Sequence, residues 1–262
     1  MRNIVRPSVL IPAMILCLAL AGCGGSKVLK EPVQFTPSAA LAAAADGRLE
    51  ASVDWVIFRD GPGTWAKNAD WDEYLLSVRN RSDSTLTITA VRVIDSLETP
   101  VAADDDRKRL IKASRQTTKR YKGQGVEVRA GMSGRALAVA GTAATVAAVG
   151  AGSAIVYGGA GLAAGVAGGL LIGPALAVGG IVKGANNSKV AKEIQARHTD
   201  LPLTIDVGKA RGMDLFFALG PSPRRVEIDY SDVDGEHVLV VDTEAALAGL
   251  HLPETGGATA GE

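Results

Sequence analysis

A stretch of 47 residues without one charged side chain interrupts the middle of this 262-residue sequence and most limits how the chain can fold. Of residues 136–182, 27 are Ala or Gly. A surface helix of a water-soluble domain needs a polar face, and this stretch has none. Its length suffices for two helices, residues 136–157 and 160–182, each about 33 Å long and matched to the hydrocarbon core of a bilayer. The stretch therefore predicts an inserted transmembrane helical hairpin.

Small residues recur at every fourth position in both halves of this predicted hairpin. The first half contains Ala136, Ala140, Ala144, Ala148 and Gly152, and the second contains Gly161, Gly165, Gly169 and Gly173. A stripe of small residues lets two helix backbones approach closely in lipid and gain van der Waals contact. The spacing resembles the glycine zippers of bacterial membrane lipoproteins and self-associating membrane segments. Two interpretations remain open, namely packing within one hairpin and packing between copies of the chain.

The N-terminus has the order of features found in a bacterial export signal. Two arginines stand in the first six residues, and an uncharged apolar run follows from residue 9 to residue 20. That run is too short to span a bilayer comfortably. It ends in Leu20, Ala21, Gly22 and Cys23, a sequence that resembles the lipobox of bacterial lipoproteins.

This resemblance implies that the Cys23 thiol receives a diacylglyceryl group, that residues 1–22 are removed, and that the new amine is acylated. Two or three acyl chains anchor a protein stably, whereas a single chain binds only reversibly. In the Gram-negative lipoproteins that this sequence resembles, the absence of Asp after the Cys implies release to the outer membrane, and Gly24 stands there. The alternative is an ordinary secretory signal in which Cys23 takes no part.

The composition of the mature chain excludes two classes of protein. Without residues 1–22 the chain has 26 basic and 28 acidic residues, a net charge of −2 that gives no reason to expect a nucleic-acid partner. Of the two cysteines, Cys17 leaves with the signal and Cys23 carries lipid, so a disulfide framework is excluded.

Alternating β-type segments flank the uncharged stretch on both sides. Three precede it, at residues 49–58, 73–79 and 85–94, and four follow it, at residues 202–207, 213–219, 224–230 and 237–242. Short polar turns between them favour antiparallel pairing. Seven strands is the count of an immunoglobulin-like sandwich, although the Cys and Trp landmarks of antibody domains are absent. We expect one antiparallel sandwich split by the insertion, with two separate small β units as the alternative.

A charged stretch precedes the insertion. Asp104, Asp105 and Asp106 stand before a run of basic residues, an order that suits the dipole of a helix from about 105 to 121. Residues 107–135 hold ten Lys or Arg and Glu127 as the one acid. The segment is either a solvated surface helix or a basic segment beside a membrane, where each cation contributes about 1 kcal/mol near an anionic surface. The three aspartates are interpreted as a helix cap rather than a cation site.

No motif in the sequence predicts catalysis, a cofactor or a metal. His198, His237 and His251 lie far apart, without metal-ligand spacing, and each is expected on the surface or in a loop. Gly159, Gly161 and Ala164 satisfy a loose dinucleotide-binding pattern, but no strand precedes them. We therefore expect no enzyme.

These observations predict a domain organisation and a function. The expected parts are a signal peptide (1–22), a lipidated Cys and tether (23–47), the first part of the β domain (48–103), a basic helix and linker (104–135), the hairpin (136–182), a linker (183–200), the second part of the β domain (201–245) and a disordered tail (246–262). The expected function is that of a non-enzymatic envelope lipoprotein on the periplasmic face of the outer membrane. It would contact membrane lipid and bind another envelope protein or itself; the alternative is a pore-forming or membrane-perturbing oligomer.

Overall fold

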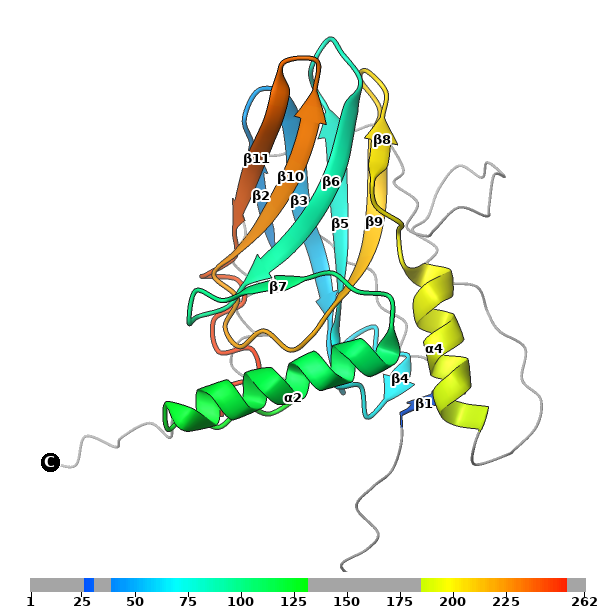
Figure 1. Cartoon of the computed structure of the whole chain (residues 1–262), viewed down its shortest axis with the longest axis vertical. Helices are drawn as coiled ribbons and strands as arrows, with labels where there is room; N and C mark the ends of the chain where they lie inside the picture. Colours follow the sequence, from blue (N-terminus) through cyan, green and yellow to red (C-terminus); the bar gives the residue numbers. More distant parts are fainter. Residues whose placement is uncertain (1–25, 31–38, 132–184, 254–262) are drawn as a thin grey trace, which may run out of the picture.

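Strands from both sides of the Ala/Gly-rich stretch share the same two β sheets. The computed structural model describes residues 26–30, 39–131 and 185–253 (Figure 1). Strand β5 (Asp72–Asn80) pairs with β9 (Ala210–Phe217), and β6 (Leu86–Ile94) pairs with β10 (Arg225–Asp232). The chain therefore forms one β domain split by an insertion, and the alternative of two separate β units is wrong.

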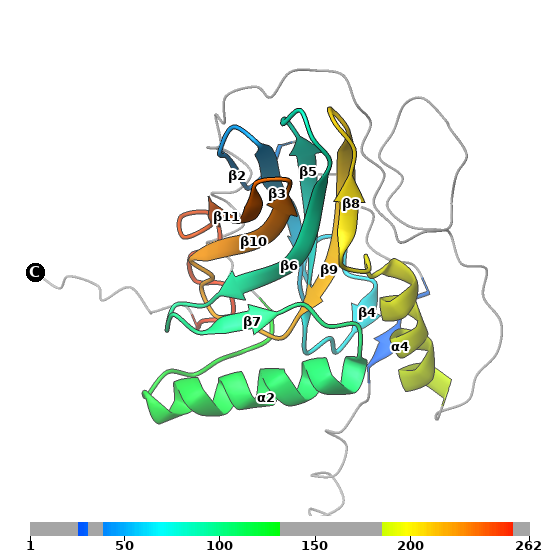
Figure 2. The ribbon, with the colours of Figure 1, turned by 45° about the horizontal axis from the view of Figure 1, so that its top comes forward.

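The two sheets lie face to face as an antiparallel β sandwich. The first sheet has the order β2 (Ala42–Ala45), β3 (Leu49–Ile57), β5, β9. The second has the order β11 (Gly235–Asp242), β10, β6, β7 (Pro100–Ala102), and β8 (Leu203–Ile205) also pairs with β6. A separate ribbon joins β1 (Lys27–Val28) to β4 (Ala66–Lys67). Two helices, α2 (Arg107–Gly123) and α4 (Ala185–Arg197), pack against the sandwich (Figures 1 and 2).

The seven strands expected from the sequence all form, as β3, β5, β6, β8, β9, β10 and β11. Three segments differ from expectation. The predicted tether includes β1 and β2, and the predicted linker 183–200 is mostly α4. The predicted tail from residue 246 is ordered as far as residue 253, because Leu247 and Leu250 are buried in the sandwich core. These segments lack a local periodic pattern and gain their structure from contacts with the sandwich.

A bulge in β3 gives the first sheet two apolar faces. Leu49, Ala51 and Val53 point into the sandwich, but the pairing with β5 shifts at Asp54, where one extra residue is accommodated. Because of this shift, Trp55 lies on the outer face of the sheet and Val56 on the inner face, so β3 contributes apolar side chains to two separate hydrophobic clusters. Hydroxyl groups of Ser52 and Ser77 donate hydrogen bonds to the Asp54 carboxylate at the bulge.

The second core lies between the outer face of this sheet and the segments that cover it. Apolar residues of β3, β5 and β9 meet Val190 and Ile194 of α4 there. The three tryptophans of the chain, Trp55, Trp65 and Trp71, all belong to this cluster. Each large apolar side chain buried in this way contributes about 1.5–3 kcal/mol. Helix α4, which directly follows the insertion, is thus bound to the sandwich by an apolar contact.

Two predicted features cannot be compared with the fold. Residues 136–182, with the expected glycine stripe, and Leu20–Cys23 lie outside the described residues. Within the described ranges, neither helix has the length and apolar character needed to cross a bilayer.

Candidate functional site

Helix α2 lies across one end of the sandwich, where β1 and α4 are also found (Figures 1 and 2). Asp106 is its N-cap and accepts a hydrogen bond from the backbone N–H of Arg109 at 2.8 Å. Asp104 forms an ion pair with the Arg109 side chain at 2.7 Å, and Asp105 lies 3.2 Å from the same group. The prediction of a capped helix at this position is confirmed, with bounds two residues later than expected.

One face of α2 is fastened to the sandwich. Leu110, Ser114, Thr117 and Tyr121 are buried, at the three- and four-residue spacing of a helix face. The Ser114 hydroxyl donates to the carbonyl of Asp70 at 2.5 Å and accepts from the backbone N–H of Leu219 at 3.0 Å. Because these contacts come from distant parts of the chain, they hold the helix in one orientation.

The opposite face of α2 carries a row of cations that we call the basic stripe. It consists of Lys108, Lys112, Arg115, Lys119 and Lys122. Their spacing of four, three, four and three residues keeps them on one side of the helix. All five side chains are exposed, and within the described part of the chain none of them forms an ion pair. The 17 residues of α2 include no Asp or Glu, so no acid on the helix offsets this charge.

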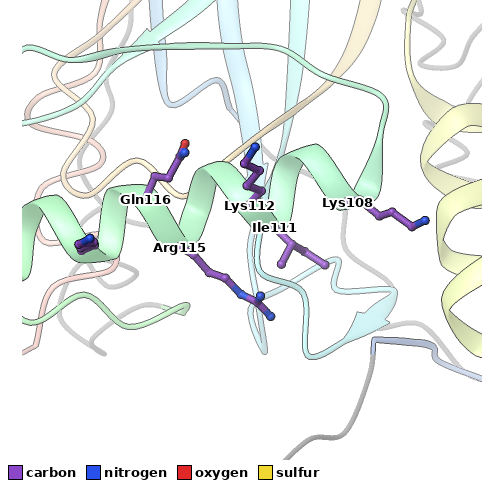
Figure 3. Close-up of a pocket in the computed structure, with 6 residues that line it drawn as sticks. Lys108, Ile111, Lys112, Arg115 and Gln116 are labelled. Carbon is purple, nitrogen blue, oxygen red and sulfur yellow. The ribbon is translucent and has the colours of Figure 1, made fainter.

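An open groove follows the basic stripe along the helix. Its volume is about 480 Å³. The residues that line it occupy successive turns of α2 (Figure 3): Lys108, Ile111, Lys112, Arg115, Gln116 and Lys119. The aliphatic stems of the Lys and Arg side chains, together with Ile111, make an apolar floor, while the charged ends remain in water. This arrangement attracts anionic groups that are attached to apolar ones.

The N-terminal segment is tied to the start of the same helix. Ser26 is buried, and its hydroxyl accepts a hydrogen bond from Arg107 Nη2 at 2.9 Å. The same hydroxyl donates to the carbonyl of Asn68 at 3.2 Å. Cys23 precedes Ser26 by three residues, so covalent geometry alone keeps their Cα atoms within about 11 Å. The described part of the N-terminal segment thus begins beside the first residue of α2.

A buried histidine lies where the chain leaves the described region toward the insertion. The backbone N–H of His251 donates to the carbonyl of Gly131 at 3.2 Å, and His251 Nε2 lies 2.7 Å from Asp72 Oδ2. His251 lies in a turn, in agreement with the prediction of a surface or loop position, but its side chain is buried and has the carboxylate of Asp72 as a partner inside the protein. His237 Nε2 lies 3.0 Å from Asp232 Oδ1, and burial lowers the pKa of His198. In the ranges that the structure describes, no three His, Cys, Asp or Glu side chains are grouped as metal ligands would be.

A buried charged cluster joins the end of α4 to the first sheet. Arg197 Nη1 lies 3.2 Å from Glu73 Oε1, and Arg197 Nε lies 2.8 Å from Glu193 Oε1. The guanidinium also stacks 4.9 Å from the ring centroid of Trp65, whose indole N–H donates to Glu73. Burial, together with the charge of Glu73, raises the pKa of Asp214 well above its ordinary value. Glu73 and Asp214 are only 1% and 4% exposed, so substrate has no access to this carboxyl pair and it holds α4 in place.

The sequence predicted the basic segment but not that five of its cations share one exposed face of a helix. The stripe could have been found from the helical spacing of its five cations. In contrast, the contacts of Ser26 with Arg107 and of His251 with Asp72 join residues 81 and 179 positions apart and leave no local signal.

Comparisons with protein-family models, with curated proteins and with solved structures found no match. Three features distinguish the described part of the molecule. These are an antiparallel β sandwich, a basic helix across one end, and an N-terminal segment fastened beside that helix.

Proposed function

We propose that this protein is a non-enzymatic, lipid-anchored envelope lipoprotein whose β sandwich binds another envelope protein. One observation carries the proposal. Ser26, three residues after the predicted lipidation position Cys23, is buried and hydrogen-bonded to Arg107 at the start of the basic helix. An acyl anchor on Cys23 would therefore bring one defined end of the sandwich to the membrane and leave the other end free.

The sheet order supports an immunoglobulin-like domain as the binding part. In that class, strands A, B and E are neighbours in one sheet, and strands C, F and G in the other. Taking β3, β5 and β9 as A, B and E, and β6, β10 and β11 as C, F and G, reproduces both sets of neighbours. Sandwiches of this class present loops at both ends, and loops on a rigid scaffold commonly carry binding residues.

The inserted stretch 136–182 is proposed to form a transmembrane hairpin. Two spans return the chain to the side from which it left. Gly131 is hydrogen-bonded to His251, which contacts Asp72 at the start of β5, and α4 also lies at the end of the sandwich that carries α2. The stripe of Gly161, Gly165, Gly169 and Gly173 would then pack helix against helix. Crosslinking of a Gly165→Leu variant tests packing between copies: oligomers that persist unchanged would exclude it.

Metabolic labelling tests the anchor. Cells producing the natural chain, a Cys23→Ser variant or a Cys17→Ser control are grown with radiolabelled palmitate and fractionated. The natural chain and the Cys17→Ser control should be labelled and recovered with the outer membrane, whereas Cys23→Ser should carry no label. Recovery of an unlabelled natural chain as freely soluble periplasmic material would overturn the proposal.

The binding role has its own test. The natural chain is crosslinked in intact cells and recovered from solubilised envelopes, and its covalent partners are identified. A partner attached to the sandwich end remote from α2 agrees with the proposed orientation. Recovery of crosslinks only between copies of this chain would replace partner binding with self-association.

A further inference from the structure

We propose that the basic stripe of α2 binds the headgroup phosphates of an anionic phospholipid bilayer, so that α2 lies flat along the membrane. The inference rests on the proposed lipid anchor and adds a second contact to it. The anchor alone would bring this end of the sandwich to the membrane, and the second contact would fix the direction of α2 along the membrane surface.

The position of the stripe on the helix gives the first argument. The buried face of α2 packs against the end of the sandwich, and the stripe lies on the opposite side. From Lys108 to Lys122 the helix advances about 21 Å. All five cations therefore face away from the protein along one straight line, as a planar charged surface requires.

The distribution of counter-charges gives the second argument. Two other arginines of α2 are paired with carboxylates of the protein: Arg109 pairs with Asp104, and Arg120 pairs with Asp95 at 2.5 Å. The stripe residues have no such partners in the described ranges. The uncompensated positive charge of the helix is thus concentrated on the outward face, where Ile111 and the aliphatic stems also supply apolar contact.

The nearby anchor identifies the occupant. Ser26, whose hydroxyl accepts a hydrogen bond from the first residue of α2, follows Cys23 by three residues, which is a chain length of at most about 11 Å. With Cys23 acylated, this short span would keep the start of α2 near the lipid surface, whose charge acts over a Debye length of about 8 Å at physiological ionic strength. A soluble acidic protein would have to compete for the stripe with a membrane surface that the anchor keeps nearby. Charge complementarity and proximity together favour the bilayer.

Vesicle sedimentation tests the inference without lipidation. The probe is the full mature chain, residues 23–262 with Cys23→Ser, added to vesicles of phosphatidylcholine or of equal parts phosphatidylcholine and phosphatidylglycerol. Binding through the uncharged stretch should be similar for both vesicle types. The ratio of partition coefficients, anionic over neutral, therefore isolates the electrostatic contact.

A matched pair of triple variants assigns that contact to the stripe. The first is Lys112→Gln, Arg115→Gln and Lys119→Gln. The control is Arg81→Gln, Lys209→Gln and Arg211→Gln, which removes the same charge from exposed residues at the opposite end of the sandwich. Each cation near an anionic surface raises partitioning roughly fivefold at low salt. The stripe variant should therefore lower the ratio on the order of 100-fold, and the control should leave it within a few-fold.

Each outcome is decisive. An unchanged ratio in the stripe variant, or an equal loss in the control, overturns the inference, provided that urea unfolding midpoints show both variants to be folded. A stripe variant that keeps the ratio but loses a crosslinked envelope protein assigns the stripe to an acidic partner instead. A chain that is labelled with palmitate but shows no preference for anionic vesicles supports the lipoprotein proposal and refutes the membrane contact of α2. A chain that prefers anionic vesicles but takes up no label supports the membrane contact and refutes the lipoprotein proposal.

Discussion

Replacing Arg197 with Met tests whether the buried charged cluster holds α4 on the sandwich. Arg197 is the ion-pair partner of Glu73, whose side chain is almost completely buried on β5. Met retains much of the length of the apolar stem but removes the positive charge and the guanidinium that lies over Trp65. The variant therefore leaves the Glu73 carboxylate in the interior without a compensating cation.

The expected cost follows from this arrangement. Removing one partner of a buried ion pair costs about 3–5 kcal/mol, because the remaining charge is not solvated. The lost stacking of the guanidinium on Trp65 contributes about 0.5–1 kcal/mol. We expect Arg197→Met to lower the free energy of unfolding by about 4 kcal/mol. For a domain of this size each kcal/mol lowers Tm by about 2–4 °C, so Tm should fall by roughly 8–16 °C.

Urea denaturation followed by tryptophan fluorescence measures this change, because the three tryptophans lie in the cluster that α4 covers. The double variant Glu73→Gln with Arg197→Met is the control. It removes the stranded charge and keeps an oxygen to accept the Trp65 indole hydrogen bond, so it should recover at least half of the loss. A loss below about 1 kcal/mol for Arg197→Met, or a double variant no more stable than the single one, would refute the reasoning.

Three further predictions concern other described residues. The raised pKa of Asp214 means that the folded state retains a proton that the unfolded state loses above about pH 4, so the free energy of unfolding falls as pH rises toward the raised pKa, by up to about 1.4 kcal/mol per pH unit. Over that pH range the urea midpoint of Asp214→Asn should rise relative to that of the natural chain, whereas parallel pH profiles would contradict the shift. Asp106→Ala removes the N-cap of α2 and should cost about 1 kcal/mol in thermal unfolding, while Asp105→Ala should cost far less, and equal losses would exclude the cap as the cause. Gly61→Ala would place a Cβ against the buried Phe58 ring and should lower the free energy of unfolding by about 1–3 kcal/mol. Gly123→Ala is the control, because its new Cβ meets no atom within 4 Å, and an unchanged stability of Gly61→Ala would show that the ring moves aside.

Local patterns predicted the strands and α2 because their causes are local. Residues 85–94 alternate with a period near two, and β6 occupies residues 86–94. Three aspartates followed by a run of basic residues, an order that suits the helix dipole, predicted a capped helix that the structure confirms. In each case a few neighbouring residues contain the hydrogen-bonding and burial pattern of the element.

Elements without such patterns could not be predicted. Strand β2 is four alanines, which have no alternation, and it forms by pairing with β3. Helix α4 has two deeply buried apolar residues, Val190 and Ile194, and owes its position to the outer face of the first sheet. The bulge at Asp54 adds Trp55 to the apolar side chains of that face, which also include Leu75 and Phe216, and the bulge is defined by the register with β5.

The sequence by itself determined the strand segments, the basic helix and the uncharged stretch that divides the β domain, since each of these depends on residues close together in the chain. Only the tertiary structure decided which strands share a sheet, that five cations of α2 face outward, and that Ser26 is fastened beside them. The pairs Glu73–Arg197 and Asp72–His251 are separated by 124 and 179 residues, and their partners meet only when the sheets assemble. Contacts of this kind depend on register and packing between distant segments, which no local pattern contains.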